Sequence, residues 1–186
     1  GIITLTTNMS SPLLEFVKRS RLPVVDVAAG SSVPRFSRVQ PDNFAIGRVA
    51  AEEFLGRGFQ HFAFFTLDRT APVVSERIRG FRATVEQAGH RLHVLDYTER
   101  IKMKGGWEFM LLWLGRELKK LPKPLATMAQ YDAEASYIVK AAMEANLHVP
   151  EEIGVIGVDN DPIYSELCLV PLTSVISNME LVGYQG

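Results

Sequence analysis

A short apolar run from Ile153 to Val158 restricts the fold of this chain more than any other stretch. The run is rich in β-branched residues, is too short for a helix and is bounded by turn-forming residues. Such a run is typical of a strand that is buried on both faces, as in a parallel sheet covered by helices. It stops at Asp159-Asn160-Asp161-Pro162. Because ligands of open α/β sheets bind just beyond the carboxyl ends of the strands, the Asp159 carboxylate is expected to face a crevice and not the core.

From residue 43 onward, helical and strand patterns alternate along the chain. Strands are predicted at 61–65, 92–95, 125–129, 153–158 and 172–176. Helices are predicted at 44–56, from the cap Ser75 to Gln87, and at 107–120, 133–145 and 162–167. This alternation predicts an α/β fold with a parallel sheet, right-handed crossovers and flanking helices. The segment before residue 43 predicts part of another such layer, with a helix at 11–19 and strands at 2–6, 22–27 and 37–40.

The composition excludes several classes of protein. With 186 residues, 47% of them hydrophobic, the chain is long enough for one compact domain or two small lobes. A net charge of -1 gives no electrostatic sign of nucleic-acid binding. The single cysteine, Cys168, cannot form an internal disulfide, which fits a reducing compartment. No apolar run approaches the roughly 20 residues of a membrane helix, and no signal peptide is visible.

Both ends of the chain look cut. Strand-like sequence begins directly at Gly1, and Met179 to Gly186 predicts the first turns of a helix that does not finish. The chain is therefore expected to be a fragment of a longer protein.

Four residues suited to ligand binding fall where strands or loops lead into predicted helices: Arg77, Trp107, Asp132 and Asp159. In a parallel sheet, all the strand-to-helix connections lie on one edge. The four side chains are therefore expected to converge on one ligand.

The two carboxylates differ in their structural alternatives. Asp132 precedes a predicted helix, so it is either a cap that satisfies a helix-end amide or a ligand-binding group, and the two roles can coexist. Asp159 has no such structural need, because Asp161, directly before Pro162, is the better cap. A ligand-binding role is therefore favoured for Asp159.

The cation and the indole also have alternatives. Arg77 falls in the first turn of its predicted helix, where a cation opposes the helix dipole, and this favours a ligand or a carboxylate partner over a solvated position. A guanidinium that faces a carboxylate suits neighbouring hydroxyls, because it offers several donors in a fixed geometry. Trp107 follows Gly105-Gly106. Core packing is its alternative, but the flexible entry favours a ring that faces a pocket and covers the C–H face of a sugar.

The sequence lacks the motifs of the common cofactor and catalytic sites. It contains no Gly-rich phosphate loop of either common spacing and no nucleophile elbow. Its histidines show no metal-ligand spacing, and they are His61, His90, His93 and His148. No cofactor or metal is therefore expected. Carboxylates at strand ends also serve catalysis, so an acid/base pair stays an open alternative.

Several stretches resemble the effector-binding core of LacI/GalR-type transcription regulators, and more closely the xylose-operon regulators of the AraC type. The matching segments are Leu22 to Val25, Asp42-Asn43 with Gly47, Glu53 to Phe59, His61 to Phe64, Glu76 to Phe81, Val149 to Asp161, Pro171 to Val175 and Gly183-Tyr184. Each piece is weak alone, but their order and spacing together are specific. The resemblance implies a two-lobed fold of the periplasmic-binding-protein type I. Residues 43–173 would form a complete second lobe, and residues 1–42 with 174–186 only part of the first.

The resemblance also implies roles for single residues. Arg77 matches the arginine that binds effector hydroxyls, Asp159 the acidic effector ligand, and Trp107 the ring that stacks on a sugar. Asp132 matches the Asp of a usual Asn-Asp pair. Tyr131 stands in place of the Asn, which argues against direct sugar bonding at that position and points to a different ligand.

The function that the resemblance implies is that of a sugar-sensing domain of a bacterial transcription regulator. A pentose or hexose effector would bind between two lobes of a cytoplasmic homodimer and alter DNA binding by a separate helix-turn-helix domain, which this chain lacks. A periplasmic sugar-binding protein of a transporter is the alternative, with the same fold and pocket. An enzyme on the same scaffold would need an activated group, and the sequence indicates none.

Overall fold

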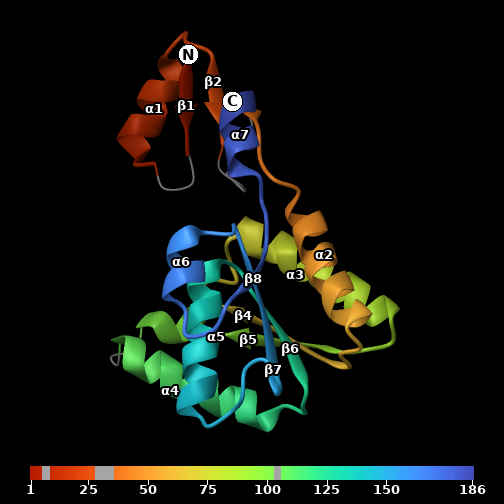
Figure 1. Ribbon diagram of the computed structural model, residues 1–186. Coiled ribbons are helices and arrows are strands. Elements are labelled where there is room, and N and C mark those ends of the chain that lie inside the picture. Colours follow the sequence, from red (N-terminus) through yellow and green to blue (C-terminus); the bar gives the residue numbers. More distant parts are fainter. Residues whose placement is uncertain (6–8, 28–35, 103–105) are drawn as a thin grey trace. The chain divides into compact units, whose positions relative to one another are not determined.

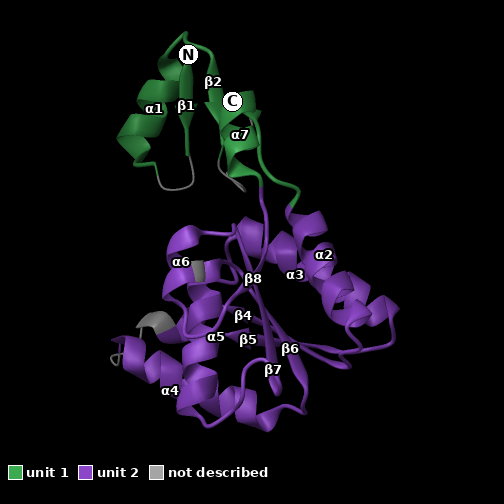
Figure 2. Ribbon diagram, viewed as in Figure 1, with its two compact units in different colours: residues 1–42, 178–186 green, residues 43–177 purple. Residues whose placement is uncertain are grey.

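The structure, a computed structural model, describes residues 1–5, 9–27, 36–102 and 106–186. The chain forms two compact units, which are residues 1–42 with 178–186 and residues 43–177 (Figure 2). From the sequence we expected the second unit to end at residue 173, with residues 174–186 returning to the first unit. The difference concerns β8 (Thr173–Val175), because this strand pairs with a strand of the second unit.

The second unit is built on a parallel sheet with the strand order β5–β4–β6–β7–β8. The strands before β8 are β4 (His61–Thr66), β5 (Leu92–Asp96), β6 (Leu125–Ala129) and β7 (Ile153–Val158). The run from which the fold was predicted is thus β7, which lies between two other strands. All of its residues are buried except Val155, which is partly buried. The predicted parallel sheet is confirmed.

Helices cover both faces of this sheet (Figure 1). The helices of the second unit are α2 (Asn43–Gly56), α3 (Pro72–Gln87), η1 (Thr98–Lys102), α4 (Gly106–Lys120), α5 (Asp132–Glu144) and α6 (Pro162–Leu167). The pair α2 and α3 packs on one face, and the pair α4 and α5 packs on the other. This is the layered arrangement that the alternating sequence predicts.

Strand β4 explains why both faces need a cover. Phe62 and Phe64 belong to the core under α2 and α3, whereas Ala63 and Phe65 belong to the core under α4 and α5. All four side chains are fully buried. Successive side chains of a strand point to opposite faces, so a continuous apolar run is stable only between two helical layers.

The helices α2 and α3 cross with their backbones in direct contact. A Cβ atom added at Gly47 would lie 2.0 Å from the carbonyl oxygen of Arg77, and one added at Gly80 would lie 2.0 Å from that of Phe44. Both positions therefore require glycine. The contact also fixes the part of α3 that carries Arg77 against the start of α2.

The first unit contains a smaller parallel sheet with the order β1–β2–β3. Its described elements are β1 (Ile2–Thr4), α1 (Ser11–Arg19), β2 (Val24–Asp26), β3 (Ser37–Arg38) and α7 (Met179–Gln185). The helix predicted at 11–19 is confirmed, and Pro12 is its second residue, where the missing N–H of proline costs no helical hydrogen bond. The strands are shorter than predicted.

One predicted helix start is wrong. We expected α3 to begin after a cap at Ser75, but the helix begins at Pro72 with Ala71 as N-cap. Proline is favourable at this first position, because its fixed φ suits a helix and its missing N–H has no partner there. Arg77 is consequently in the second turn, so the argument from an unfavourable position in the helix dipole does not hold.

Candidate functional site

Three connections at the carboxyl ends of the central strands carry the polar side chains of the second unit. They follow β4, which ends at Thr66, and β6 and β7, after which they begin at Gln130 and Asp159. Because the strands are parallel neighbours, these connections share one edge of the sheet. We call this edge the carboxyl-end rim.

Arg77 reaches the carboxyl-end rim from α3. It is only 3% exposed. Its Nε donates a hydrogen bond to Oδ1 of Asn43 at 3.0 Å, and its Nη1 donates to the carbonyl oxygen of Gln130. Its guanidinium carbon lies 4.8 Å from the centre of the Tyr131 ring. The guanidinium thus joins α2, α3 and the end of β6.

Two opposite effects act on the charge of Arg77, which are its burial and the acidic groups near it. Burial lowers the pKa of Arg77, while Tyr131, Asp159, Glu134 and Asp132 act in the opposite direction. A buried guanidinium is tolerated when nearby carboxylates and acceptors offset its lost hydration. Arg77 and the two predicted carboxylates are therefore electrostatic neighbours at the same rim.

Asp132 is the first residue of α5 and is buried. Its Oδ2 accepts a hydrogen bond from the backbone N–H of Asp161 at 2.7 Å, and its Oδ1 accepts one from the Ser174 hydroxyl at 2.7 Å. Burial raises the pKa of Asp132, and these two hydrogen bonds oppose the shift. The N-cap of α5 is the preceding residue, Tyr131. The Asp132 carboxylate thus ties α5 to the loop after β7 and to β8.

The backbone next to Asp132 leaves no room for another side chain. A Cβ atom added at Gly157 in β7 would lie 2.1 Å from Oδ1 of Asp132. Glycine at this position lets the carboxylate approach β7 closely enough to reach the loop after this strand and the neighbouring strand β8.

Asp159 follows β7 in an unusual backbone conformation. Its φ is 99° and that of Asn160 is 54°, in the region that non-glycine residues rarely adopt. The Asp159 N–H donates to the carbonyl oxygen of Val175 at 2.9 Å. The carboxylate is half-buried, and no hydrogen bond to it comes from the described part of the chain. Strained conformations of this kind cluster at ligand sites, where the surrounding structure holds them.

Trp107 is the second residue of α4 and is 44% exposed. Its ring centre lies 4.4 Å from that of Tyr137 in an edge-to-face geometry. Gly106 before it has a φ of 58°, whereas Gly105, the other predicted hinge residue, lies outside the described residues. The two rings border a hollow of about 270 Å³, which is also lined by Leu67, Tyr97, Arg100 and Met110. This is an open aromatic hollow and not core packing.

A chain of buried hydrogen bonds that we did not predict runs from the end of β4 to the first turn of α5. The Thr66 hydroxyl donates to Oε1 of Gln130 at 2.6 Å, and Nε2 of Gln130 donates to Oε1 of Glu134 at 2.7 Å. Glu134 is 7% exposed, and burial raises its pKa to about 7. Its charge acts on Arg77 on one side and on Tyr137 on the other.

The sequence gives little sign that Glu134 is buried and bonded to Gln130. Acidic residues are common in the first turn of a helix, where they favour the dipole, so Glu134 has the pattern of an ordinary surface residue. The signal that was available is Gln130 directly at the end of the β6 run, because a polar residue there points into the rim.

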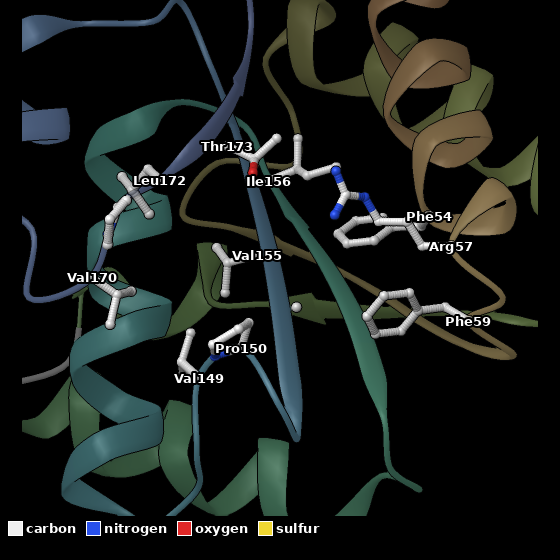
Figure 3. Close-up of a pocket in the computed structure, with 12 residues that line it drawn as sticks. Phe54, Arg57, Phe59, Val149, Pro150, Val155, Ile156, Val170, Leu172 and Thr173 are labelled. Carbon is white, nitrogen blue, oxygen red and sulfur yellow. The ribbon is translucent and has the colours of Figure 1, made fainter.

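A larger cavity, of about 380 Å³, lies at the opposite edge of the sheet, near the amino ends of β7 and β8 (Figure 3). It is lined by Phe54, Arg57, Phe59, Val149, Pro150, Gly154, Val155, Ile156, Val170, Pro171, Leu172 and Thr173. The one charged group in this lining, Arg57, already pairs with Glu53 at 2.6 Å. A ligand site needs a few convergent polar groups, and these are at the carboxyl-end rim.

Two other features bear on the chemistry of the described residues. Within residues 1–5, 9–27, 36–102 and 106–186, no group of three or more His, Cys, Asp or Glu side chains is placed to hold a metal ion. None of the helices described here has the length and apolar character needed to cross a bilayer.

Comparison with protein families gives a match over most of the chain. Residues 51–186 match the family of the periplasmic binding protein-like domain. Among curated proteins, the xylose operon regulatory protein of Escherichia coli K12 is 28% identical over 171 residues, which are 89% of this chain and 43% of that protein. The chain thus spans less than half the length of this relative.

Solved structures with the same fold are also similar. The structure of a xylose-binding transcription activator matches with a TM-score of 0.80 and 25% identity, over 95% of this chain and 47% of that one. A regulatory protein of the LacI family from Chloroflexus aggregans matches with a TM-score of 0.77 and 23% identity, over 98% of this chain and 64% of that one. The predicted resemblance to LacI/GalR-type effector-binding domains is confirmed.

Proposed function

This chain belongs to the family of periplasmic binding protein-like domains, and on this premise we propose that it is the effector-binding domain of a bacterial transcription regulator. We propose a pentose or hexose sugar as the effector, bound at the carboxyl-end rim. The names of the similar regulators, which include a xylose operon regulator and a xylose-binding activator, support this choice.

One observation carries the proposal. The Asp159 carboxylate stands at the end of β7 in a strained backbone, receives no hydrogen bond from the described residues and has the Arg77 guanidinium as a neighbour. A carboxylate beside a guanidinium offers acceptors and donors to adjacent sugar hydroxyls, and hydrogen bonds to charged groups are the stronger ones.

The other rim residues have distinct parts in this proposal. Asp132 has both oxygens bonded within the second unit, so it positions the loop that carries Asp159. Trp107 and Tyr137 offer apolar ring surface to the C–H face of a sugar. That a second lobe encloses the ligand stays a prediction of the family resemblance.

The effector alters DNA binding through a difference in affinity. A ligand shifts an equilibrium between two conformations only if it binds one of them more tightly. We propose that the full-length protein carries a DNA-binding domain, acts as a homodimer and is located in the cytoplasm, as the role of a transcription regulator implies. An AraC-type helix-turn-helix is the expected form of that domain.

Two alternatives share this fold. A transport protein would bind the same sugars without DNA, and an export signal in place of a DNA-binding domain in the full-length sequence would identify it. An enzyme would consume the sugar. Recovery of unchanged sugar after a long incubation with the protein is the result that we expect.

Calorimetry on the full-length protein with a panel of pentoses and hexoses tests the proposal. We expect at least one sugar to bind, and Asp159→Asn to weaken its binding at least tenfold, about 1.4 kcal/mol. Asparagine tolerates a positive φ, so this variant removes the charge and keeps the backbone. Glu151→Ala, an exposed carboxylate at the other end of β7, is the matched control and should bind normally. Heat from none of the sugars, or equal affinity of Asp159→Asn and wild type, contradicts the proposal.

A further inference from the structure

Glu134 has an unused oxygen in the interior of the site. Its Oε1 accepts the hydrogen bond from Gln130, but its Oε2 is buried and has no hydrogen-bond partner among the described residues. A buried acceptor without a donor destabilises a protein, because the oxygen has lost water and gained nothing. Such an atom is stable in a native site when a ligand supplies the missing donor.

Glu134 has electrostatic neighbours in both the charged part and the aromatic part of the site. Arg77 of α3 and Asp159 after β7 act on it electrostatically, and its own charge acts on Tyr131 before α5 and on Tyr137 one turn further along that helix. Arg77 and Asp159 form the charged half, and Tyr137 packs against Trp107 in the aromatic half. A ligand that contacts both halves passes Glu134.

We propose that Glu134 is a further ligand-binding residue, whose Oε2 accepts a hydrogen bond from a hydroxyl of the bound sugar and which makes the site reject phosphorylated and acidic sugars. This proposal rests on the proposed function, because it assumes that a sugar binds at the carboxyl-end rim. It adds the chemical class of that sugar, which is uncharged and rich in hydrogen-bond donors.

The balance of charge explains the selectivity. Within the described residues, the three carboxyl groups of Asp132, Glu134 and Asp159 act electrostatically on the guanidinium of Arg77 and favour its charge. That guanidinium already donates to Asn43 and to the Gln130 carbonyl. A phosphate or carboxylate brings further negative charge to a rim where three carboxyl groups already act on this one guanidinium, and it offers no donor to the free carboxylate oxygens of Asp159 and Glu134.

Access to Oε2 requires a side chain to move. The oxygen is shielded from water in this structure. Tyr131 is half-buried, and its ring covers the Arg77 guanidinium at 4.8 Å. A sugar that displaces this ring would expose the guanidinium to the ligand.

The protonation of Glu134 gives the proposal a measurable signature. Burial raises its pKa to about 7, so the free protein at neutral pH is a mixture of both forms. A hydroxyl that donates to Oε2 favours the ionised form. Binding is therefore expected to release a proton and to tighten as the pH rises. Tyr131 and Tyr137 keep their protons in this range, because burial raises the pKa of each.

Calorimetric titrations of the full-length protein at pH 6, 7 and 8 test the inference with the best-binding sugar of the panel, its phosphate monoester and its uronic acid. We expect the affinity of wild type for the neutral sugar to rise about tenfold from pH 6 to pH 8, because the ionised fraction of a group with a pKa of about 7 rises from about a tenth to about nine tenths. The two acidic sugars should bind at least a hundredfold more weakly.

Glu134→Gln should weaken binding of the neutral sugar at pH 8 about tenfold and remove the pH dependence. Glu144→Gln, an exposed carboxylate on the same helix, should retain wild-type affinity and pH dependence. Titrations of wild type at pH 7 in two buffers of different ionisation enthalpy need no variant and should reveal proton release on binding.

The outcomes separate the two proposals. A wild-type protein that binds no sugar overturns the proposed function. If wild type binds sugar but Glu134→Gln retains its affinity and pH dependence, or wild type releases no proton, then the Glu134 inference is overturned and the proposed function stands. Tighter binding of the phosphate ester than of the neutral sugar overturns the selectivity.

Discussion

Arg77 shows what a residue position in the sequence does and does not reveal. The rule for parallel sheets places strand ends on one edge, and from it we predicted that Arg77, Trp107, Asp132 and Asp159 converge on one ligand. In the structure Asp132 and Asp159 act electrostatically on Arg77, and the convergence of all four on a ligand stays a prediction. Their partners are not predictable in the same way, because the hydrogen bonds of Arg77 go to residues 34 and 53 positions away along the chain. Glu134 was missed for a different reason, because an acidic residue in the first turn of a helix has the pattern of an ordinary surface residue.

A change of Arg77 to lysine is expected to destabilise the second unit. The guanidinium bonds Asn43 and the Gln130 carbonyl from a rigid fork, and a single ammonium cannot replace both bonds. We expect a loss of about 1–3 kcal/mol in the free energy of unfolding, as for other buried hydrogen bonds to charged groups. Urea unfolding measures this, with the exposed Arg79→Lys as control. Equal stability of Arg77→Lys and wild type would show that the two bonds contribute nothing.

Glu134 is expected to make stability depend on pH. Its pKa is about 7 in the folded protein and near the ordinary glutamate value of 4.5 when the chain is unfolded. Between these values the folded state holds more protons, so the Glu134 contribution to stability falls as the pH rises from about 4.5 to 7. The full effect is at most about 3 kcal/mol, since one pKa unit equals 1.36 kcal/mol.

Urea unfolding of wild type and Glu134→Gln at pH 5 and pH 8 measures that effect. The variant should gain stability relative to wild type at pH 8, because it has no charge to bury. If the two proteins keep the same difference in stability at both pH values, then Glu134 does not titrate in this window.

At the scale of elements, the strands were more predictable than the helix ends. The central strands β4, β6 and β7 are apolar runs buried on both faces, and β6 was predicted with its observed bounds. The start of α3 was not, because we took Ser75 as the cap, whereas the helix begins three residues earlier at Pro72. The sequence also did not reveal that Gly47 and Gly80 form one contact.

That contact gives an element-scale prediction. An alanine at Gly80 would place its Cβ 2.0 Å from the Phe44 carbonyl oxygen, so α2 and α3 must separate. We expect Gly80→Ala to lower the free energy of unfolding by about 3 kcal/mol, at the upper end for overpacked sites. The shift also separates Arg77 from Asn43, so sugar binding should weaken. Gly56→Ala, at the end of α2 with open space around it, is the control. A fully stable Gly80→Ala protein would contradict the close crossing.

At the scale of the whole molecule, the sequence predicted two units and a ligand-responsive role, since the resemblance extends over both. It could not reveal which sugar binds, because specificity depends on hydrogen-bond geometry within the rim. Whether sugar binding raises or lowers the affinity for DNA depends on the conformations of the full-length protein, and a local sequence pattern carries no information on these.

Sugar and operator DNA are expected to affect each other's binding to the full-length protein. Typical couplings are about 1–3 kcal/mol, which corresponds to about 5- to 150-fold in affinity, and thermodynamic linkage requires the same factor in both directions. Fluorescence titrations of labelled operator with and without sugar, and sugar calorimetry with and without operator, measure both factors. Asp159→Asn should bind operator but lose the response. An operator affinity that saturating sugar leaves unchanged would contradict the regulatory role.

The most direct measurement is a crystal structure of the full-length protein with its sugar bound. We expect ligand oxygens within hydrogen-bond distance of the carboxylates of Asp159 and Glu134, and of the Arg77 guanidinium, at the carboxyl ends of β4, β6 and β7. A sugar bound instead in the apolar cavity at the amino ends of β7 and β8, with those three side chains unchanged from the free protein, would contradict the account.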